Sequence, residues 1–238
     1  GTLQGLLELA DIPVIGCGVL SSALCMDKYR AHQLAQAAGV AVPASHLVQP
    51  DTPAQQWASW AAALGYPLFV KPLRAGSSFG ISKVLSAQQL PAALEAAFAY
   101  DDTALLEECI PGFEVGCALL GTHSLEAGRV DEIELADGFF DFKEKYTLET
   151  ASIHVPARIT PEQEAQVLQA AKTVYRALDC HGFARVDLFC TPDGRVVFNE
   201  VNTIPGFTAH SRFPSMFQAA GLSFSQMIAE IIRQGVSA

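Results

Sequence analysis

The sequence is short of positive charge: 15 lysines and arginines stand against 25 aspartates and glutamates, which gives a formal net charge of −10. This deficit argues against a general nucleic-acid binder, because such proteins neutralise many phosphates with basic side chains. It leaves room for a local site where a few lysines meet a phosphate. No apolar run approaches the roughly 18 residues of a membrane span, and no segment reads as a secretory signal peptide. We therefore expect neither a nucleic acid nor a membrane as partner.

Paired cysteines are missing as well. Six cysteines are scattered in apolar contexts without C-x-x-C spacing, so neither a zinc site nor a disulfide framework is indicated. We therefore expect reduced thiols and a cytoplasmic protein. Internal repeats and an initiator methionine are also absent, and because residues 1–18 begin inside a helix-like pattern, we expect a truncated chain.

Apolar residues, by contrast, make up 50% of the 238 residues and supply a core for one large domain or two small ones. Short strand-like and helix-like segments alternate along the chain, which indicates an α+β or α/β architecture. The helix at residues 21–40 is predicted to have Lys28 near its middle and to end at Gly39. Strands are predicted at 12–18, 42–48 and 66–73, and further helices at 3–10, 53–65 and 86–100.

The clearest helix signal follows Thr160, which can act as N-cap with Pro161 at the first helical position and Gln163 at the third. This is the pattern of a capping box. After this helix, the apolar strand 183–190, the turn TPDG and a second strand from Phe198 predict a β-hairpin.

The hairpin strands carry polar residues at alternating positions. Arg185 and Asp187 share one face of the first strand, and Glu200 and Asn202 share one face of the second. We predict the register that pairs Asp187 with Glu200, which needs a loop of about four residues, or a bulge, around Pro192 to Arg195. Asp187, Glu200 and Asn202 then offer three hard oxygen donors, which suit magnesium. Taken alone, polar residues on a half-exposed hairpin face are the commoner explanation.

Residues 70–84 form a second candidate site. The small residues from Ala75 to Ser78, with Ser77 among them, let backbone N–H groups approach a phosphate, and Lys71 adds a positive charge. The pattern is not a Walker A loop, because strands flank it on both sides and no long helix follows. It predicts a flexible hairpin lid, with an ordinary Gly-Ser turn as the alternative.

Two further segments carry candidate residues. Glu107 and Glu114 bracket a Pro-Gly turn, where carboxylates can bind a ribose hydroxyl or an adenine amine, although a solvated loop is the commoner case. Residues 138–150 are rich in aromatic and charged side chains but lack periodicity, which is typical of a lid over an active site. Lys145 and Tyr146 are the lid residues that we expect to reach inward.

Six motifs in this order resemble the ATP-grasp ligases, specifically the D-alanine:D-alanine ligase family, over essentially the whole chain. They are GTLQGLLELA, SALCMDK, KPLRAGSSFGISKV, FFDFKEKYTLET, ARVDLF and FNEVNTIPGFTAHSR. The resemblance implies an α+β ATP-grasp fold that holds ATP between two domains rich in antiparallel strands. Residues 1–27 would be the tail of a truncated N-terminal α/β domain, 28–115 the central domain and 116–238 the C-terminal domain. The implied cofactors are ATP and two Mg²⁺ ions, with Mn²⁺ as a substitute.

The family's reaction is a ligation in two steps. ATP phosphorylates the carboxylate of D-alanine, and the amine of a second D-amino acid attacks the acylphosphate to form a dipeptide for peptidoglycan. The full-length protein is expected to form a homodimer. By motif position, the resemblance implies that the metal ions are bound by Asp187, Glu200 and Asn202, and that the nucleotide phosphates are contacted by Lys28, Lys71, Lys145 and Ser78. Glu107 and Glu114 would contact the adenine and ribose, and Arg185 the transferring phosphoryl group. Gly206 would offer an N–H to the oxyanion, Ser77 and Tyr146 would close the lid, and Ser211 would bind the carboxylate of the second substrate.

Arg212 departs from the commoner family pattern. This position is usually apolar in the D-alanine:D-alanine enzymes, whereas the D-alanine:D-serine ligases of vancomycin resistance have an arginine there. A serine hydroxyl can accept a hydrogen bond from an arginine, and the methyl analogue cannot. The pair Lys145 and Tyr146 argues against the D-lactate-forming relatives, whose lid differs. The expected second substrate is therefore D-serine, followed by D-alanine and then by D-lactate.

Two other functions stay open on the sequence. The family's glutamate for the first D-alanine belongs to a domain upstream of Gly1, so one alternative is a fragment that binds Mg-ATP without ligating. The other is a different ATP-grasp ligase, a carboxylase or carbamoyl-phosphate enzyme, which shares the lysines and metal ligands. Such an enzyme lacks the NTIPGFT and KYT motifs that are present here.

Overall fold

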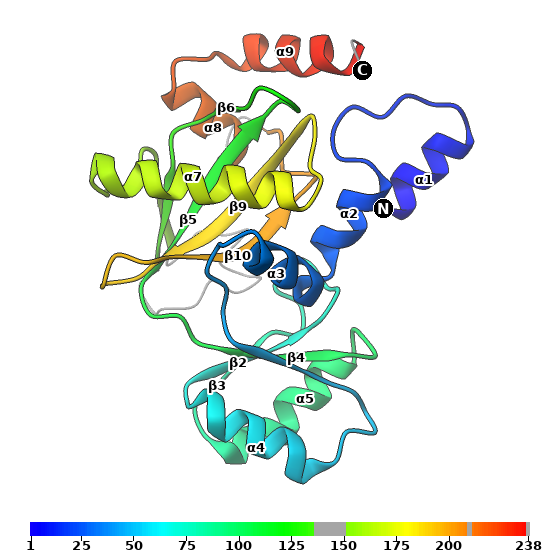
Figure 1. Ribbon diagram of the computed structural model, residues 1–238, viewed down its shortest axis with the longest axis vertical. Helices are drawn as coiled ribbons and strands as arrows, with labels where there is room; N and C mark the ends of the chain where they lie inside the picture. The colour runs from blue at the N-terminus through cyan, green and yellow to red at the C-terminus, as the bar shows by residue number, and fades with distance from the viewer. Residues whose placement is uncertain (136–150, 209–210, 237–238) are drawn as a thin grey trace.

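The computed structural model describes residues 1–135, 151–208 and 211–236. Within these ranges the strands form two sheets built from antiparallel pairs, one above the other in Figure 1, with helices packed on their faces. This mixture of helices and antiparallel sheets confirms the predicted α+β class. None of the described helices has the length and apolar character that crossing a membrane would need.

The lower sheet of Figure 1 has four strands, and two helices cover one of its faces. Leu68, Val70 and Leu106 are fully buried against these helices. Because successive side chains point to opposite faces, Phe69 and Lys71 lie on the other face of the sheet. In spatial order the strands are β1 (Ser45–Val48), β4 (Ala104–Glu108), β2 (Leu68–Pro72) and β3 (Ser82–Val84), and the helices are α4 (Ala54–Leu64) and α5 (Leu90–Phe98), with the 3-10 turn η1 (Ala87–Gln89) before α5.

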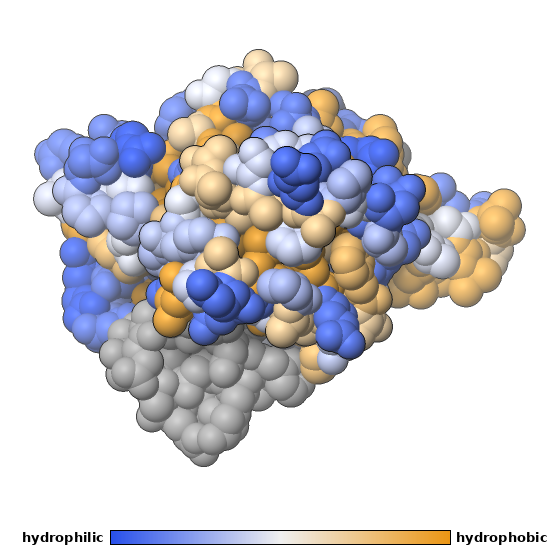
Figure 2. Space-filling model, turned by 90° about the horizontal axis from the view of Figure 1, so that it is seen from below, coloured by the Kyte–Doolittle hydropathy of each residue, from blue (hydrophilic) through white to orange (hydrophobic). Residues whose placement is uncertain are grey.

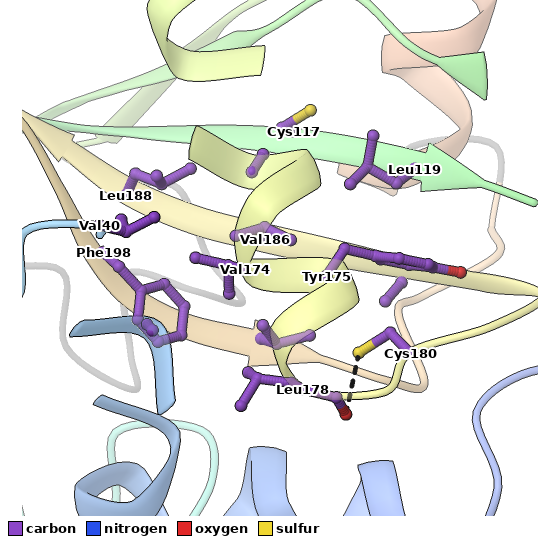
Figure 3. Packing of buried hydrophobic residues seen from close by; sticks show 14 of the residues in the cluster. Val40, Cys117, Leu119, Val174, Tyr175, Leu178, Cys180, Val186, Leu188 and Phe198 are labelled. Atoms are coloured by element: carbon purple, nitrogen blue, oxygen red, sulfur yellow. Dashed lines mark hydrogen bonds between the residues drawn. The ribbon is translucent and has the colours of Figure 1, made fainter. Parts of the chain in front are cut away.

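The upper sheet has six strands and is packed on both faces. Cys117 and Leu119 belong to the cluster beneath helix α7 (Figure 3), whereas the alternating residues Ala118 and Leu120 pack against α8 and α9. Its spatial order is β10 (Val196–Asn202), β9 (Phe183–Cys190), β5 (Phe113–Leu120), β7 (Asp131–Leu135) and β8 (Ala151–His154), with β6 (Glu126–Ala127) paired to β5; the helices are α7 (Pro161–Ala177), α8 (Arg212–Ala219) and α9 (Phe224–Val236).

Helix α7 begins with the predicted capping box. The Thr160 hydroxyl accepts a hydrogen bond from the Gln163 N–H at 3.2 Å, and the Gln163 side chain accepts one from the Thr160 N–H at 3.1 Å. Two N–H groups that a helix start leaves unsatisfied therefore have partners. On the apolar stripe of the helix, Val174 and Tyr175 are fully buried on the sheet (Figure 3), and Leu168 is partly buried.

The N-terminal part corrects two predictions. Residues 12–18 form no strand, and Gly16 has φ +122°, a conformation that interrupts extended backbone. The single helix at 21–40 is also wrong, because α2 (Val19–Met26) and α3 (Lys28–Ala37) are separate helices. Asp27 stands between them, and its side chain accepts the Arg30 N–H at 2.9 Å, which caps α3. Lys28 is therefore the first residue of a helix and does not lie in the middle of one.

Helix α1 (Thr2–Leu9) confirms the predicted helix at the start of the chain, and it projects from the rest of the molecule (Figure 1). Leu6 is 64% exposed and Leu9 is 91% exposed. In Figure 2 this projection is the largely orange surface at the right of the view. Its apolar face has little cover from the described residues.

Strands β9 and β10 form the predicted hairpin. Phe198 pairs with Leu188 and Glu200 pairs with Asp187, and the register shifts between Phe198 and Glu200. Asn199 is therefore the extra residue of a β-bulge. The predicted pairing of Asp187 with Glu200 is confirmed, but the bulge that produces it lies at Asn199 and not around Pro192 to Arg195.

Candidate active site

A cavity of about 370 Å³ lies between the two sheets. The four-stranded sheet contributes Phe69, Lys71 and Glu107 to its wall, and the six-stranded sheet contributes Glu114 and Glu200. Residues that the sequence separates widely therefore meet in one place. Lys28, Ser77, Ser78, Phe189, Glu132, Glu134 and Arg158 complete much of the remaining wall.

Two buried lysines face this cavity. Lys71 is 7% exposed and forms an ion pair with Glu107, which is 1% exposed. The Lys28 ammonium donates a hydrogen bond of 2.6 Å to the carbonyl oxygen of Ala75. A buried charge is costly unless it is paired, and Glu107 supplies that pairing for Lys71 at the cavity wall. The second oxygen of Glu107, Oε2, has no hydrogen-bond partner among the described residues.

The loop between β2 and β3 is held at its base. The Arg74 guanidinium donates to both Asp101 oxygens at 3.0 and 2.6 Å, and this bond lowers the pKa of Asp101 to about 2. At the tip, Ser77 and Ser78 have φ values of 51° and 58°, a left-handed conformation that L-residues rarely adopt. A loop with strained serines and a fixed base fits close backbone approach to an anion. The β2–β3 pairing confirms the predicted hairpin.

The predicted metal ligands lie on adjacent hairpin positions. Asp187 is 1% exposed, and Arg185 donates to both of its oxygens at 2.8 and 2.7 Å. Glu200 stands directly opposite Asp187, and Asn202 stands opposite Arg185. The Asn202 side-chain oxygen accepts the Ile204 N–H at 3.1 Å, which fixes the turn after the strand.

No group of three or more His, Cys, Asp and Glu side chains is arranged to hold a metal ion within residues 1–135, 151–208 and 211–236. The hairpin set has two carboxylates and one amide. It still fits magnesium, because that ion is commonly held by one or two carboxylates together with substrate phosphates. To complete the ligands of a magnesium ion, a nucleotide or another source of oxygen atoms would be needed beside Asp187 and Glu200.

Arg212 is surrounded by carboxylates. Its guanidinium donates to Asp131 at 2.7 and 2.8 Å and lies 3.3 Å from Glu114 and 3.4 Å from Asp187. Burial opposes its charge, but Asp131 and Asp187 outweigh that cost and hold the pKa of Arg212 well above its ordinary value. The guanidinium is therefore committed to several acidic partners.

Sequence reasoning missed Asp131, which is fully buried. The Gly116 N–H donates to it at 2.9 Å, and a side-chain carbon at Gly116 would lie 2.4 Å from the Arg212 guanidinium. The glycine is needed because the Arg212–Asp131 pair fills the space. An aspartate in a strand otherwise rich in glutamate was the available signal, but nothing in the sequence paired it with Arg212.

Gly206 and Ser211 are neighbours. A side-chain carbon at Gly206 would lie 2.7 Å from the Ser211 hydroxyl, which accepts the Thr208 N–H at 3.0 Å. Ser211 also stands at the N-cap of α8. Lys145 and Tyr146 lie outside the described residues, so the assignments made to this lid pair stay predictions.

Residues 34–233 match the family model described as D-ala D-ala ligase C-terminus. The crystal structure of the VanG D-Ala:D-Ser ligase from Enterococcus faecalis is 57% identical, with a TM-score of 0.92 over 99% of this chain and 68% of that chain. The D-alanine-D-alanine ligase from Coxiella burnetii is 32% identical, with a TM-score of 0.88 over 100% of this chain and 64% of that chain.

A putative D-alanine–D-lactate ligase of Streptomyces coelicolor is 48% identical over 96% of this chain and 66% of the relative. The chain thus spans about two thirds of the length of these proteins. The activities by which these proteins are named differ in the second substrate.

Proposed function

The chain belongs to the D-ala D-ala ligase family, and from this premise we propose that it carries the ATP site of a ligase joining D-alanine to D-serine. One observation carries the ATP site: the cavity between the sheets has Lys28 and Lys71 in its wall together with Glu200, which pairs across the β9–β10 hairpin with the buried Asp187. Such an arrangement suits a nucleotide whose phosphates bridge lysines and a cation.

The nucleotide contacts follow from the cavity wall. Lys28, Lys71 and the Ser77–Ser78 backbone contact phosphates, and Glu107 and Glu114 contact the adenine and ribose. The unpartnered Oε2 of Glu107 supports the first of these carboxylate roles, because a buried acceptor gains from an adenine N–H donor. Lys145 joins the phosphate contacts by family resemblance.

Phosphoryl transfer is the first chemical step. A carboxylate oxygen of D-alanine bonds to the terminal phosphorus of ATP as the bond to ADP breaks, and an acylphosphate forms. Arg185 keeps Asp187 in place with two of its donor nitrogens, and its remaining N–H groups contact the phosphoryl group in transfer. Asp187, Glu200 and Asn202 would hold Mg²⁺, which would supply positive charge beside the phosphate oxygens.

Ligation is the second step. The amine of the second amino acid attacks the acyl carbon and the C–N bond forms. The bond from the acyl carbon to the phosphate oxygen breaks, and the departing phosphate takes up the proton that the amine loses. The Gly206 N–H stabilises the oxyanion, while Ser211 at the start of α8 receives the carboxylate of the attacking amino acid. The close approach of Gly206 to Ser211 supports a common site for both roles.

D-serine as second substrate rests on Arg212 and on the likeness to the VanG enzyme. A second candidate, D-alanine, is favoured by the commitment of the Arg212 donors to Asp131, Glu114 and Asp187. Under that alternative Arg212 holds the surrounding carboxylates in place and does not hydrogen-bond to a hydroxyl of the second substrate.

The test is a ligation assay with ATP, D-alanine and a second substrate, D-serine, D-alanine or D-lactate, read by ADP release and by mass spectrometry of the product. We expect a D-alanyl-D-serine product at the highest kcat/KM. A higher kcat/KM for D-alanine would reject the D-serine assignment. ATP binding without any product from this 238-residue chain would instead identify it as a binding unit.

A further inference from the structure

His32 of helix α3 is buried where the helix meets strand β10, with 1% of its surface exposed. Its ring packs edge-on against Phe198, with ring centroids 5.5 Å apart. Its Nε2 lies 2.8 Å from the carbonyl oxygen of Asn199. A carbonyl oxygen can only accept, so Nε2 carries the proton and donates.

Asn199 is the extra residue of the β10 bulge. A bulge leaves one residue outside the ladder, and its polar backbone groups must find partners elsewhere. Strand β10 is also the edge strand of its sheet, so no further strand lies beside it among the described residues. His32 supplies the missing donor for the Asn199 carbonyl, and the neighbouring Ala41 carbonyl accepts the Phe198 N–H at 2.8 Å.

The bulge decides which way Glu200 points. If the pairing of Phe198 with Leu188 continued without a bulge, Asn199 would oppose Asp187 and Glu200 would oppose Val186. Side chains alternate across a strand, so a slip of one residue would move Glu200 to the face opposite Asp187. The hydrogen bond from His32 therefore holds the backbone geometry that brings the two carboxylates together.

The other ring nitrogen lies near Glu107 of the four-stranded sheet. Nδ1 lies 4.0 Å from Glu107 Oε2, and neither atom has a hydrogen-bond partner among the described residues. Burial lowers the pKa of His32 and outweighs the opposing effect of Glu107, so the ring is neutral and Nδ1 presents a lone pair. His32 thus contacts the bulge of β10 and abuts Glu107 of the other sheet without binding its carboxylate.

We propose that His32 is a positioning residue: by holding the Asn199 bulge it sets the Asp187–Glu200 pair for a magnesium-bound nucleotide. The inference rests on the proposed function, because it concerns the same site. It makes a side-chain donor of helix α3 a requirement for metal-dependent binding, although His32 does not line the cavity.

Two amide variants separate this role from simple packing. Glutamine can place its side-chain nitrogen near the position of Nε2, whereas asparagine is too short to reach the Asn199 carbonyl. The measurement is the dissociation constant of ADP with and without Mg²⁺, by titration calorimetry on the 238-residue chain. Circular dichroism checks that each variant is folded. The control is His46→Asn, because His46 lies in strand β1 of the four-stranded sheet, where it stacks on Trp60 of helix α4.

We expect Mg²⁺ to tighten ADP binding in the parent chain and in His32→Gln, and this tightening to fall by about tenfold in His32→Asn. Metal-free ADP binding should change little in either variant. Equal tightening in all variants would overturn the role of His32, and so would an equal loss in His32→Gln and His32→Asn. A parent chain whose ADP binding ignores Mg²⁺ would reject the proposed metal site itself, and the inference with it.

Discussion

The buried position of Arg212 leads to a strong prediction about stability. Its side chain is 9% exposed, and its bidentate partner Asp131 is 0% exposed. Replacing Arg212 with leucine keeps an apolar side chain in the space but leaves the Asp131 carboxylate without its cation. Breaking a buried ion pair from one side costs about 3–5 kcal/mol, because the remaining charge is uncompensated.

The expected change in melting temperature follows from the size of the chain. In domains of about 150–250 residues each 1 kcal/mol shifts Tm by about 2–4 °C, so Arg212→Leu should lower Tm by about 6–20 °C. Thermal unfolding followed by circular dichroism measures this directly. Arg233→Leu is the matched control, because Arg233 is 67% exposed and its pair with Glu230 is a surface pair, which contributes little.

A second substitution tests the cause. Asp131→Asn removes the charge but keeps an oxygen that accepts the Gly116 N–H. The double variant Arg212→Leu with Asp131→Asn should therefore recover most of the lost stability, as a double-mutant cycle would report. A single variant within about 2 °C of the parent, or a double variant as unstable as the single, would refute the reasoning.

Three other perturbations test the surroundings of the site. Gly116→Ala should destabilise the chain by about 1–3 kcal/mol in urea unfolding, because the new carbon meets the Arg212–Asp131 pair; an unchanged midpoint contradicts this. Lys71→Met should weaken ATP binding at least about tenfold by calorimetry, since a charged donor is lost; equal affinity argues against a phosphate contact. Arg74 lowers the pKa of Asp101 in the folded protein from 3.8 to about 2, so Asp101 adds stability above pH 4 that is lost as the pH falls towards 2. In acid unfolding, Asp101→Asn should lack this part of the pH dependence of stability. A variant with the same pH dependence as the parent chain would contradict the prediction.

Local patterns predicted much of the framework. The capping box at Thr160, the β9–β10 hairpin and the pairing of Asp187 with Glu200 are signals carried within short stretches of sequence, and the structure has all three. The position of the bulge was not predictable in the same way. It depends on His32, which lies 167 residues from Asn199 in the chain.

The errors have local and long-range causes. The helix-like pattern of residues 21–40 predicted one helix, and the boundary between α2 and α3 at Asp27 was missed. An aspartate directly before Lys28 is nevertheless a recognisable N-cap. The surroundings of Arg212 are set by Asp131, 81 residues away, and by space left at Gly116. Such a contact is a property of the packed molecule. The roles given to Lys145 and Tyr146 stay predictions.

The Arg212–Asp131 pair also constrains the order in which this site can change by mutation. If Arg212 is lost first, Asp131 is stranded as a buried anion. If Asp131 becomes asparagine first, Arg212 still has Glu114 at 3.3 Å and Asp187 at 3.4 Å as counter-charges. The less costly route between an arginine and an apolar residue at this position therefore passes through a change at Asp131. Substitutions at the two positions are epistatic, and their effects depend on which arrives first.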